Sequence, residues 1–230
     1  KVDAQAASVM MGQGLGGSAN VAREYIRAME ESVQENFGPD NHCINCMCHP
    51  TECVYSYKTT SVARVSDDFY PRDTSSHTVH IVNVAYNSVF LGEVMQPDWD
   101  MFQSAHPAGL LHAAARAVSG GAVYVSDHPD SHDFGILKRL VLSDGRTLRA
   151  QLPGRPTRDM LFADVTSDMR SALKVYNRNK YGGVVGAFNV QGAEWCKQTR
   201  GFSKKGFDPT ELSTTIRPRD VEGLTEGEEG

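Results

Sequence analysis

Apolar side chains recur at helical spacing in three stretches of the chain. The strongest stripe begins after Ser18, a residue suited to cap a helix, and ends at the helix-breaking pair Gly38-Pro39. Two further stripes, over about residues 78–91 and 107–118, have one apolar and one polar side. The pattern therefore predicts three amphipathic helices, each with one face packed on a core.

Short apolar runs lie between these helical stretches. We interpret them as strands at Val2 to Gln5, near 43–46, near 62–65, at Val94-Met95 and at 120–127. Strands that alternate with helices are typical of a parallel α/β architecture. About five such strands predict the C-terminal half of a TIM (β/α)8 barrel.

The pattern of apolar and polar positions changes after about residue 135. From there on, strand-like runs are separated by turn residues, and no segment with helical spacing lies between them. This pattern predicts the start of an antiparallel β-sandwich. The predicted strands are 140–142, 147–149, 172–176 and 184–190. We therefore expect three regions, which are part of a barrel over 1–135, a β-rich region over 136–215 and a disordered tail over 216–230, rich in glycine and glutamate.

Composition excludes several classes of partner. The 230 residues include 28 acidic and 23 basic side chains, for a net charge of −5, and no basic stripe with interleaved aromatics, so nucleic acid is not expected. Apolar runs are too short for a membrane span, and no signal peptide is visible. We expect a cytoplasmic protein, with the plastid as the alternative. A first residue that is not methionine predicts a piece of a longer protein.

The cysteines predict neither disulfides nor a metal site. Four crowd into Cys43, Cys46, Cys48 and Cys53, with Cys196 far away, and an odd, clustered set favours a reducing compartment. The spacing C-x2-C-x-C-H-x3-C fits no common zinc site. We expect buried or site-lining thiols, no metal and no cofactor.

Acidic residues recur at the predicted strand ends, which converge on one face of an α/β barrel. They are Asp3, Asp67, Asp68, Asp98, Asp100 and Asp127. Lys1 shares a strand face with Asp3, and its ammonium keeps that carboxylate ionised. Two converging carboxylates are the minimum for glycoside hydrolysis. The alternative for each single acid is a helix cap or a solvated side chain.

Two later segments carry further candidates. In Arg64-Val65-Ser66-Asp67-Asp68-Phe69 the adjacent aspartates cannot share a strand face, so one is expected to enter the site while the other binds backbone amides or Arg64. Trp99 lies between Asp98 and Asp100, a pattern that favours a sugar packed on an aromatic ring; the alternative is a Trp buried in the core.

Long stretches of the chain resemble the plant raffinose synthase and seed imbibition protein group of glycoside hydrolase family 36, which includes the alkaline α-galactosidases. The resemblance covers about residues 1 to 200. Its motifs are Lys1-Val2-Asp3-Ala4-Gln5, residues 64–73, 96–104, 119–127 and 153–159, and Asn189-Val190-Gln191-Gly192-Ala193.

The resemblance implies a retaining α-galactosidase-type barrel followed by a β-sandwich. Asp3 would be the nucleophile and Lys1 would contact galactose hydroxyls. The acid/base would be Asp68, counted from the arginine of its segment, or Asp67, counted from the small residue before it.

The resemblance also implies a sugar-binding set around these carboxylates. Cys46 falls near a position where relatives have a site-lining cysteine, and Asp100 falls near a sugar-contacting acid. Arg64, Asp98 and Trp99 complete the expected substrate-binding residues.

Two features are similar to the alkaline α-galactosidase branch: the short connection after Asp73 and the Pro-Gly-Arg before Pro156. Departures from the family are Ala4, Met160 and the segment Cys48 to Glu52. The prediction is a retaining α-galactosidase acting on raffinose, stachyose or galactinol. One alternative is a galactinol–sucrose galactosyltransferase, with sucrose as acceptor. Another is an inactive fragment or a non-catalytic sugar-binding module.

Overall fold

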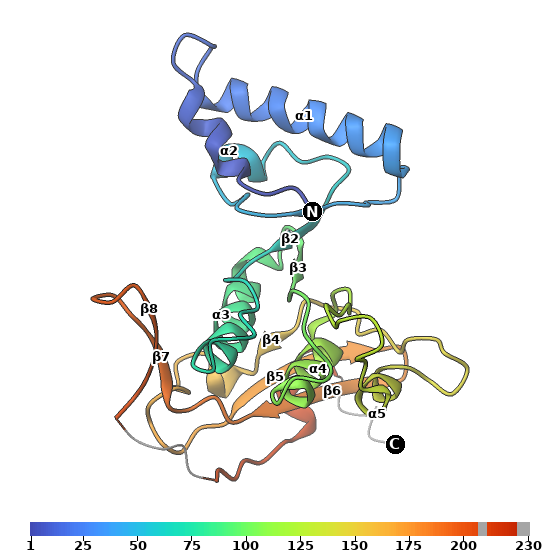
Figure 1. Ribbon diagram of the computed structural model, residues 1–230, viewed down its shortest axis with the longest axis vertical. Helices are drawn as coiled ribbons and strands as arrows, with labels where there is room; N and C mark the ends of the chain where they lie inside the picture. Colours follow the sequence, from blue (N-terminus) through green and yellow to red (C-terminus); the bar gives the residue numbers. More distant parts are fainter. Residues whose placement is uncertain (207–210, 225–230) are drawn as a thin grey trace. The chain divides into compact units, whose positions relative to one another are not determined.

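The structure, a computed structural model, describes residues 1–206 and 211–224 (Figure 1). The chain folds into two compact units. The first contains Lys1–Val65 and Leu91–Asp98, and the second contains Ser66–Phe90 and Trp99–Gly230. Each unit therefore takes two separate pieces of the chain.

The first unit is built on a parallel sheet. Its strands are β1 (Ile44–Asn45), β2 (Val62–Arg64) and β3 (Gln96–Asp98), in that order. An isolated parallel bridge between Val2 and Asn45 places the start of the chain beside β1. The connection from β2 to β3 includes a long helix, as a parallel crossover requires.

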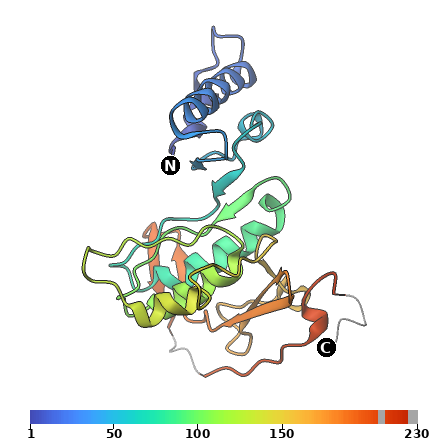
Figure 2. The same ribbon diagram turned by 90° about the vertical axis from the view of Figure 1, so that its right-hand side faces the viewer.

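The first unit also contains three helical segments (Figure 2). They are η1 (Gln5–Met11), α1 (Ser18–Phe37) and α2 (Thr51–Val54). The apolar stripe of α1 buries Ala22 and Ile26 fully, and these pack with the thiol of Cys53 on α2. The last residue of α1, Phe37, is followed by the cap residue Gly38, whose φ of 96° suits glycine.

The second unit combines helices with an antiparallel sheet. Helices α3 (Ser76–Leu91, its last residue in the first unit) and α4 (Gly109–Ser119) precede the sheet of β4 (Arg155–Pro156), β5 (Leu173–Asn179) and β6 (Gly182–Phe188). Helix α4 packs on β5 and β6. Short elements complete the unit: α5 (Phe134–Leu137), η2 (Lys138–Leu140), η3 (Arg158–Met160) and η4 (Pro218–Asp220).

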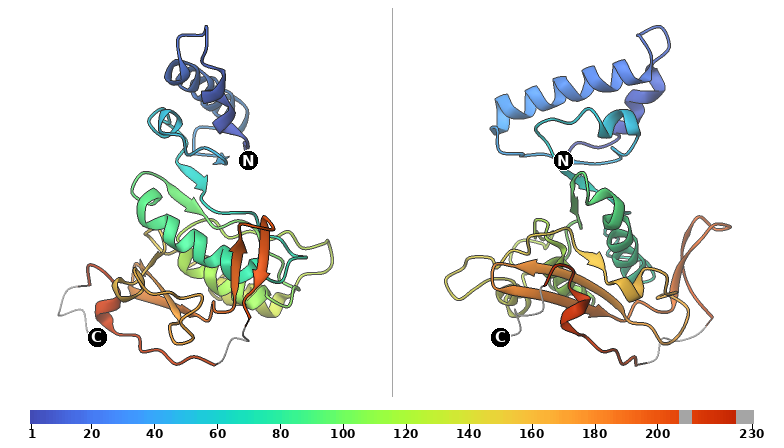
Figure 3. Two further views of the ribbon diagram at one scale, coloured as in Figure 1. Left: turned by 90° about the vertical axis from the view of Figure 1, so that its left-hand side faces the viewer. Right: turned by 180° about the vertical axis from the view of Figure 1, so that it is seen from behind.

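A separate two-stranded hairpin belongs to the second unit. Strand β7 (Ala193–Cys196) pairs with β8 (Gly201–Lys204), and Figure 3 shows the ribbon standing out from the β4–β5–β6 sheet. The sequence pattern did not predict this hairpin, because its strands are short and their polar and apolar residues mix.

All three predicted helices are present, and the strands near 44, 62, 173 and 184 are present too. The strand predicted at Val94-Met95 lies two residues later, because β3 begins at Gln96. The prediction of a full strand over Val2 to Gln5 is wrong, because Ala4 takes a left-handed conformation (φ 56°) and η1 begins at Gln5. The stretch 120–127 keeps only one parallel bridge, Val125 with Phe102. Residues 140–142 and 147–149 flank a turn but form no ladder.

The structure bears out a mixed α/β fold with parallel and antiparallel sheets. The predicted disordered tail is only partly within the described residues. There Val221 is buried, and Asp220 lies 2.9 Å from the ammonium of Lys174 on β5, so residues 218–221 are packed on the sheet; residues 225–230 lie outside the description. Among the residues described, no helix has the length and apolar character needed to cross a membrane.

Candidate functional site

Asp3 forms an ion pair at the edge of the first unit. The Lys1 ammonium lies 3.2 Å from one carboxylate oxygen of Asp3, and the backbone N–H of Ala4 donates to the other at 2.8 Å. Ala4 itself takes a left-handed conformation, and η1 begins at the next residue, Gln5. About half of the Asp3 side chain is exposed, so the group is open to a ligand.

Cys46 is the third neighbour of Asp3. The backbone N–H of Cys46 donates to the Val2 carbonyl at 2.9 Å, which places its thiol beside the carboxylate. The hydrogen bond from the Ala4 amide lowers the pKa of Asp3 most, and the Cys46 thiol and the Lys1 ammonium lower it further. Burial in turn raises the pKa of Cys46, so the thiol stays protonated and can donate.

Arg64 and Asp98 end two neighbouring strands in register. Their Cα positions pair across β2 and β3, and the Arg64 Nε lies 3.7 Å from an oxygen of Asp98. Both side chains are almost fully buried, and His49 contacts the Arg64 carbonyl at 2.8 Å. The predicted sugar ligands Arg64 and Asp98 therefore bind each other in the structure, and the pair fixes the strand ends.

The predicted acid/base segment lies at the start of the second unit. The buried carboxylate of Asp100 accepts the backbone N–H of Phe69 at 2.8 Å, which anchors the chain just after Asp68. Asp67 and Asp68 are both exposed, and the Asp67 carboxylate lies 3.5 Å from the Asn83 amide on α3. Asp100, expected to touch sugar, instead holds this segment in place.

Trp99 is fully buried, and its indole nitrogen has no hydrogen-bond partner among the described residues. A ring without exposed surface presents no face to a sugar in this structure. Trp99 thus fits the alternative that the sequence left open, a core Trp. The carboxylate beside it, Asp98, is equally buried.

Histidines and an arginine form a buried network behind the acid/base segment. Arg116 carries only donors, so its NH1 donates to the Nδ1 of His112 at 2.7 Å. The single proton of neutral His112 then lies on Nε2 and is donated to the Nδ1 of His77 at 2.8 Å. The proton of His77 is therefore on its own Nε2, which is buried and has no partner among the residues described.

Burial keeps these rings neutral. Desolvation lowers the pKa of His112 strongly, and the nearby Arg116 guanidinium lowers it further. Desolvation lowers the pKa of His77 as well, followed by the charge of His106. A second arm of the network reaches His80, whose Nε2 lies 3.2 Å from Arg116 and whose Nδ1 lies 3.0 Å from the Asp67 carbonyl oxygen. The backbone of the predicted acid/base segment thus rests on the network.

Asp127 has a structural role in the loop that follows α4. One of its oxygens accepts the backbone N–H of Ser104 at 2.6 Å, and the other accepts the Ser104 hydroxyl at 2.7 Å. His132 lies 3.1 Å from the same carboxylate. Although burial opposes them, these hydrogen bonds lower the pKa of Asp127.

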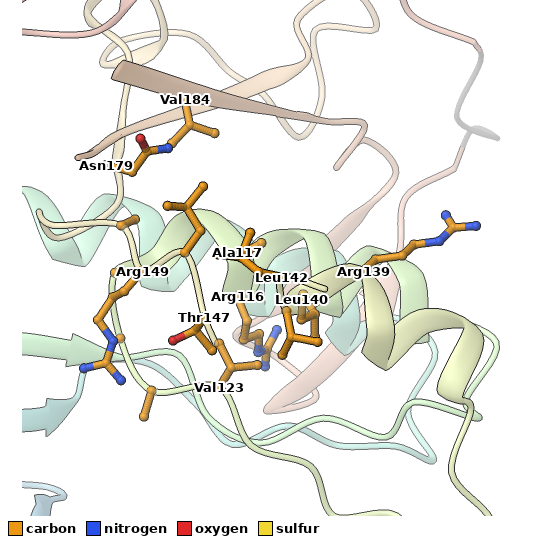
Figure 4. Close-up of a pocket in the computed structure, with 16 residues that line it drawn as sticks. Arg116, Ala117, Val123, Arg139, Leu140, Leu142, Thr147, Arg149, Asn179 and Val184 are labelled. Carbon is orange, nitrogen blue, oxygen red and sulfur yellow. The ribbon is translucent and has the colours of Figure 1, made fainter. Parts of the chain in front are cut away.

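A cavity of about 400 Å³ lies between α4 and the segment 139–150 (Figure 4). Its walls are mainly apolar, with the guanidinium groups of Arg116, Arg139 and Arg149 around it. No aspartate or glutamate lines it. This cavity therefore offers no pair of carboxylates for acid–base chemistry, and none of the predicted site residues is part of it.

A second cleft of the same unit, about 660 Å³, has a different character. Three aromatic rings line it, those of Tyr70, Trp195 and Phe202, together with charged side chains. Trp195 and Phe202 are not among the site residues predicted from the sequence. The signal that could have found them is Thr199-Arg200-Gly201, turn residues between two short runs that each carry an aromatic.

The predicted residues divide between the two units. Lys1, Asp3, Cys46, Arg64 and Asp98 belong to the first, whereas Asp67, Asp68, Trp99 and Asp100 belong to the second. The structure brings Lys1, Asp3 and Cys46 together, pairs Arg64 with Asp98, and ties Asp100 to the Asp67-Asp68 segment. In the described part of the chain, no three histidine, cysteine, aspartate or glutamate side chains are grouped to hold a metal ion.

Comparison with known proteins gives consistent matches over nearly the whole chain. Probable galactinol–sucrose galactosyltransferase 6 of Arabidopsis thaliana is 55% identical over 229 residues, which cover 98% of this chain and 30% of that protein. The galactinol–sucrose galactosyltransferase of Oryza sativa is 41% identical over 96% of this chain and 29% of the relative. Stachyose synthase of Pisum sativum is 41% identical over 81% of this chain and 23% of the relative.

The chain thus spans less than a third of the length of these curated relatives. The family model described as raffinose synthase or seed imbibition protein Sip1 matches residues 1–229. The family model covers nearly the whole chain, and a curated relative is 55% identical to it. The chain therefore belongs to the raffinose synthase and seed imbibition protein family.

Proposed function

We propose that the chain carries the reacting carboxylates of a retaining galactosyl transfer, in which galactinol is the donor and sucrose the acceptor. The observation that carries the chemistry is the Asp3 carboxylate, whose pKa is held below its ordinary value by the Ala4 amide, Cys46 and Lys1. The names of the relatives, galactinol–sucrose galactosyltransferases and a stachyose synthase, support the choice of donor and acceptor.

In the first step the ionised Asp3 attacks the anomeric carbon of the donor galactose. The bond from that carbon to the leaving oxygen breaks, and Asp68 gives its proton to that oxygen. We assign this role to Asp68, which lies four residues after Arg64, with Asp67 as the alternative. The products are a galactosyl ester on Asp3 and a free alcohol.

In the second step a sucrose hydroxyl attacks the anomeric carbon, and Asp68, now a carboxylate, takes its proton. The ester bond to Asp3 breaks, so both carboxyl groups return to their starting states. Two inversions at one carbon retain the configuration. A water molecule in place of sucrose gives free galactose with the same residues.

The parallel sheet of the first unit supports a further part of the proposal, that residues 1–135 belong to a (β/α)8 barrel. The strands β1, β2 and β3 are parallel, and the bridges at Val2 and Val125 are parallel too. Carboxylates at the C-terminal ends of such strands are where barrel enzymes place their chemistry. Asp3 and Asp98 both follow this rule.

Hydrolysis is the second candidate, and it is the function that the sequence resemblance predicts. It is favoured by the short connection after Asp73 and by Pro153-Gly154-Arg155, which are similar to the alkaline α-galactosidase branch. The relatives' names favour transfer. Every catalytic residue is shared, so the two outcomes differ only in what attacks the galactosyl ester.

A product assay separates the two functions. The chain, or a longer protein that contains it, is incubated with galactinol and sucrose, and the sugars are quantified by chromatography. Transfer predicts raffinose as the main product, whereas galactose without raffinose would replace the proposal by hydrolysis. Asp3→Asn should abolish either product, and the exposed Asp40→Asn is the matched control that should not.

A further inference from the structure

We propose that Tyr70, Trp195 and Phe202 form a saccharide subsite on the acceptor side of the reaction, which binds sucrose. The inference rests on the proposed function for its acceptor, but the cleft itself is defined by contacts within the second unit alone. Two of its aromatics come from the β7–β8 hairpin and the third comes from the acid/base segment.

The three rings form a continuous aromatic surface. Trp195 and Phe202 are directly opposite each other across β7 and β8, with ring centroids 5.2 Å apart and nearly perpendicular planes. Phe202 also meets Tyr70, at 6.0 Å between centroids. Directly opposed residues of a hairpin share one face, so the register itself places both hairpin aromatics on the same side.

The aromatic surface is open to solvent. Trp195 is 48% exposed and Tyr70 is 41% exposed, whereas the chain's other Trp is fully buried. Exposed Trp and Tyr rings present an apolar face beside a polar tip, which matches a sugar ring with its C–H face and its rim of hydroxyls. The cleft volume of about 660 Å³ lies within the range of small-ligand sites, roughly 300–1,000 Å³.

Polar groups line the cleft where the hydroxyls of a sugar need partners. Arg72 and Arg200 supply donors, and Asp73 supplies acceptors. The backbone N–H of Ser75 donates to Asp73 at 3.0 Å, which fixes the direction of that carboxylate. Aromatic walls with a few convergent polar groups are the ordinary composition of a ligand site, and both charge signs together suit a neutral polyol.

Chain continuity gives the cleft its place in the reaction. Tyr70 follows Asp68 by two residues, so their Cα atoms are at most about 7 Å apart. The acid/base protonates the leaving oxygen and later takes the proton of the attacking hydroxyl, so it stands between the galactose and the acceptor. A sugar on Tyr70 is therefore close to the group that exchanges a proton with the acceptor hydroxyl, and for this reason we place the acceptor there.

Arg200 ties the hairpin turn to this surface. Its φ of 52° is left-handed, a conformation that is unfavourable for a non-glycine residue. Glycine would remove this strain, yet here a guanidinium is carried at the lip of the cleft. Strained backbone of this kind clusters at functional sites, which fits a role for the Arg200 side chain in binding the sugar.

Binding can be tested without turnover, because Trp195 is the exposed one of two tryptophans. Acrylamide quenching of tryptophan fluorescence is measured with increasing sucrose in the millimolar range. We expect sucrose to protect Trp195 in a saturable way, and we expect no protection in Trp195→Phe, which keeps an aromatic ring but removes this fluorophore. Quenching that is unchanged by sucrose in the wild-type chain would overturn the subsite.

Transfer kinetics provide the second test. Trp195→Ala is expected to raise the KM for sucrose about tenfold or more, while the KM for galactinol changes far less. Tyr181→Ala is the matched control, because Tyr181 is 74% exposed in the same unit but lies outside the cleft. Equal sucrose KM values in Trp195→Ala and Tyr181→Ala would overturn the inference.

The two proposals can fail separately. A wild-type protein that transfers galactose to no acceptor would remove the proposed function, whereas the quenching test would still judge sugar binding at Trp195. A wild-type protein that makes raffinose but shows no sucrose protection and no KM change would keep the function and remove the subsite.

Discussion

The carboxylate of Asp3 is controlled by three neighbours that reach it from different sides. The Ala4 amide, the Cys46 thiol and the Lys1 ammonium all lower its pKa. A nucleophile must be ionised to attack, so these contacts keep the reactive form present down to low pH. The side chain remains half exposed and accessible to substrate.

Removing the Lys1 charge should change the pH profile of the reaction. In Lys1→Met the pKa of Asp3 is expected to rise, because one stabilising cation is lost, so the acid limb of kcat/KM should move to higher pH. Lys1→Arg keeps the charge and should leave the limb nearer its original place. Asp3→Asn should reduce kcat on the order of 10³-fold or more. An acid limb that does not move in Lys1→Met would contradict the assignment.

Glu30, unlike Asp3, is a buried carboxylate with a structural role. It lies on α1, is almost fully buried, and accepts the backbone N–H groups of Lys58, Thr59 and Thr60 and the Thr60 hydroxyl, at 2.8–3.1 Å. The side chain therefore closes the loop after α2 onto α1, and the loop leads directly into β2.

Glu30→Gln should lower the free energy of unfolding by about 2–3 kcal/mol, because an amide NH2 group would face these donors. Urea unfolding followed by circular dichroism measures the change. The matched control is Glu31→Gln, whose partner Arg27 is on the exposed face of the same helix, with an expected effect below about 0.5 kcal/mol. Similar losses in the two variants would show that Glu30 does not hold the loop.

Several residue-level predictions followed from the sequence because the causes are local. Lys1 and Asp3 alternate along an extended segment, and the structure pairs them. Trp99 and Asp100 could not be placed, because burial depends on what packs over them from distant parts of the chain. In the sequence, Glu30 looks like any other polar residue of an amphipathic helix. Its role as acceptor of the loop's backbone N–H groups depends on how residues 58–60 fold onto the helix.

At the scale of elements, α3 and α4 are joined through their histidines. His77 and His80 come from α3, and His112 and Arg116 come from α4. The hydrogen bonds run from Arg116 through His112 to His77 and, on the other side, to His80 beneath Asp67. These contacts couple the packing of the two helices to the position of the acid/base segment.

The network should make stability depend on pH in mildly acidic solution. Burial lowers the folded-state pKa of His112 and His77 below the ordinary 6.5, so the unfolded chain binds more protons as the pH falls below that value. The free energy of unfolding should therefore decrease between pH 6.5 and 5, with a slope that approaches about 1.4 kcal/mol per pH unit for the strongly shifted His112. The contribution of His77 has the same sign.

Urea midpoints across this range test the dependence. His112→Gln should lower stability at pH 8 and flatten the slope between pH 6.5 and 5, since one titrating ring is gone. The exposed His128→Gln should leave the slope unchanged. A slope that persists in His112→Gln would show that other groups cause the dependence.

The helices could be predicted from spacing because their periodicity is a property of each segment alone. The hairpin β7–β8 could not, since two four-residue strands carry too few positions for a period to appear. The stretch 120–127 is apolar enough for a strand, but a ladder needs a partner strand, and the parallel pairing described for this stretch is a single bridge to Phe102. Hydrogen-bond partners, unlike periodicity, are set by tertiary structure.

At the scale of the whole molecule, the chain belongs to a family whose curated members are about three times its length. Its own two units divide the proposed catalytic residues between them, Asp3 in one and Asp68 in the other.

The central claim is that Asp3 becomes bonded to galactose during the reaction. It is tested most directly by trapping the intermediate with a slow 2-deoxy-2-fluoro-galactosyl donor, followed by protease digestion and mass spectrometry of the peptides. The account predicts one fluorogalactosyl group on the peptide that contains Asp3, and none on that peptide in Asp3→Asn. A label on another residue, or turnover with inverted configuration and no label, would contradict it.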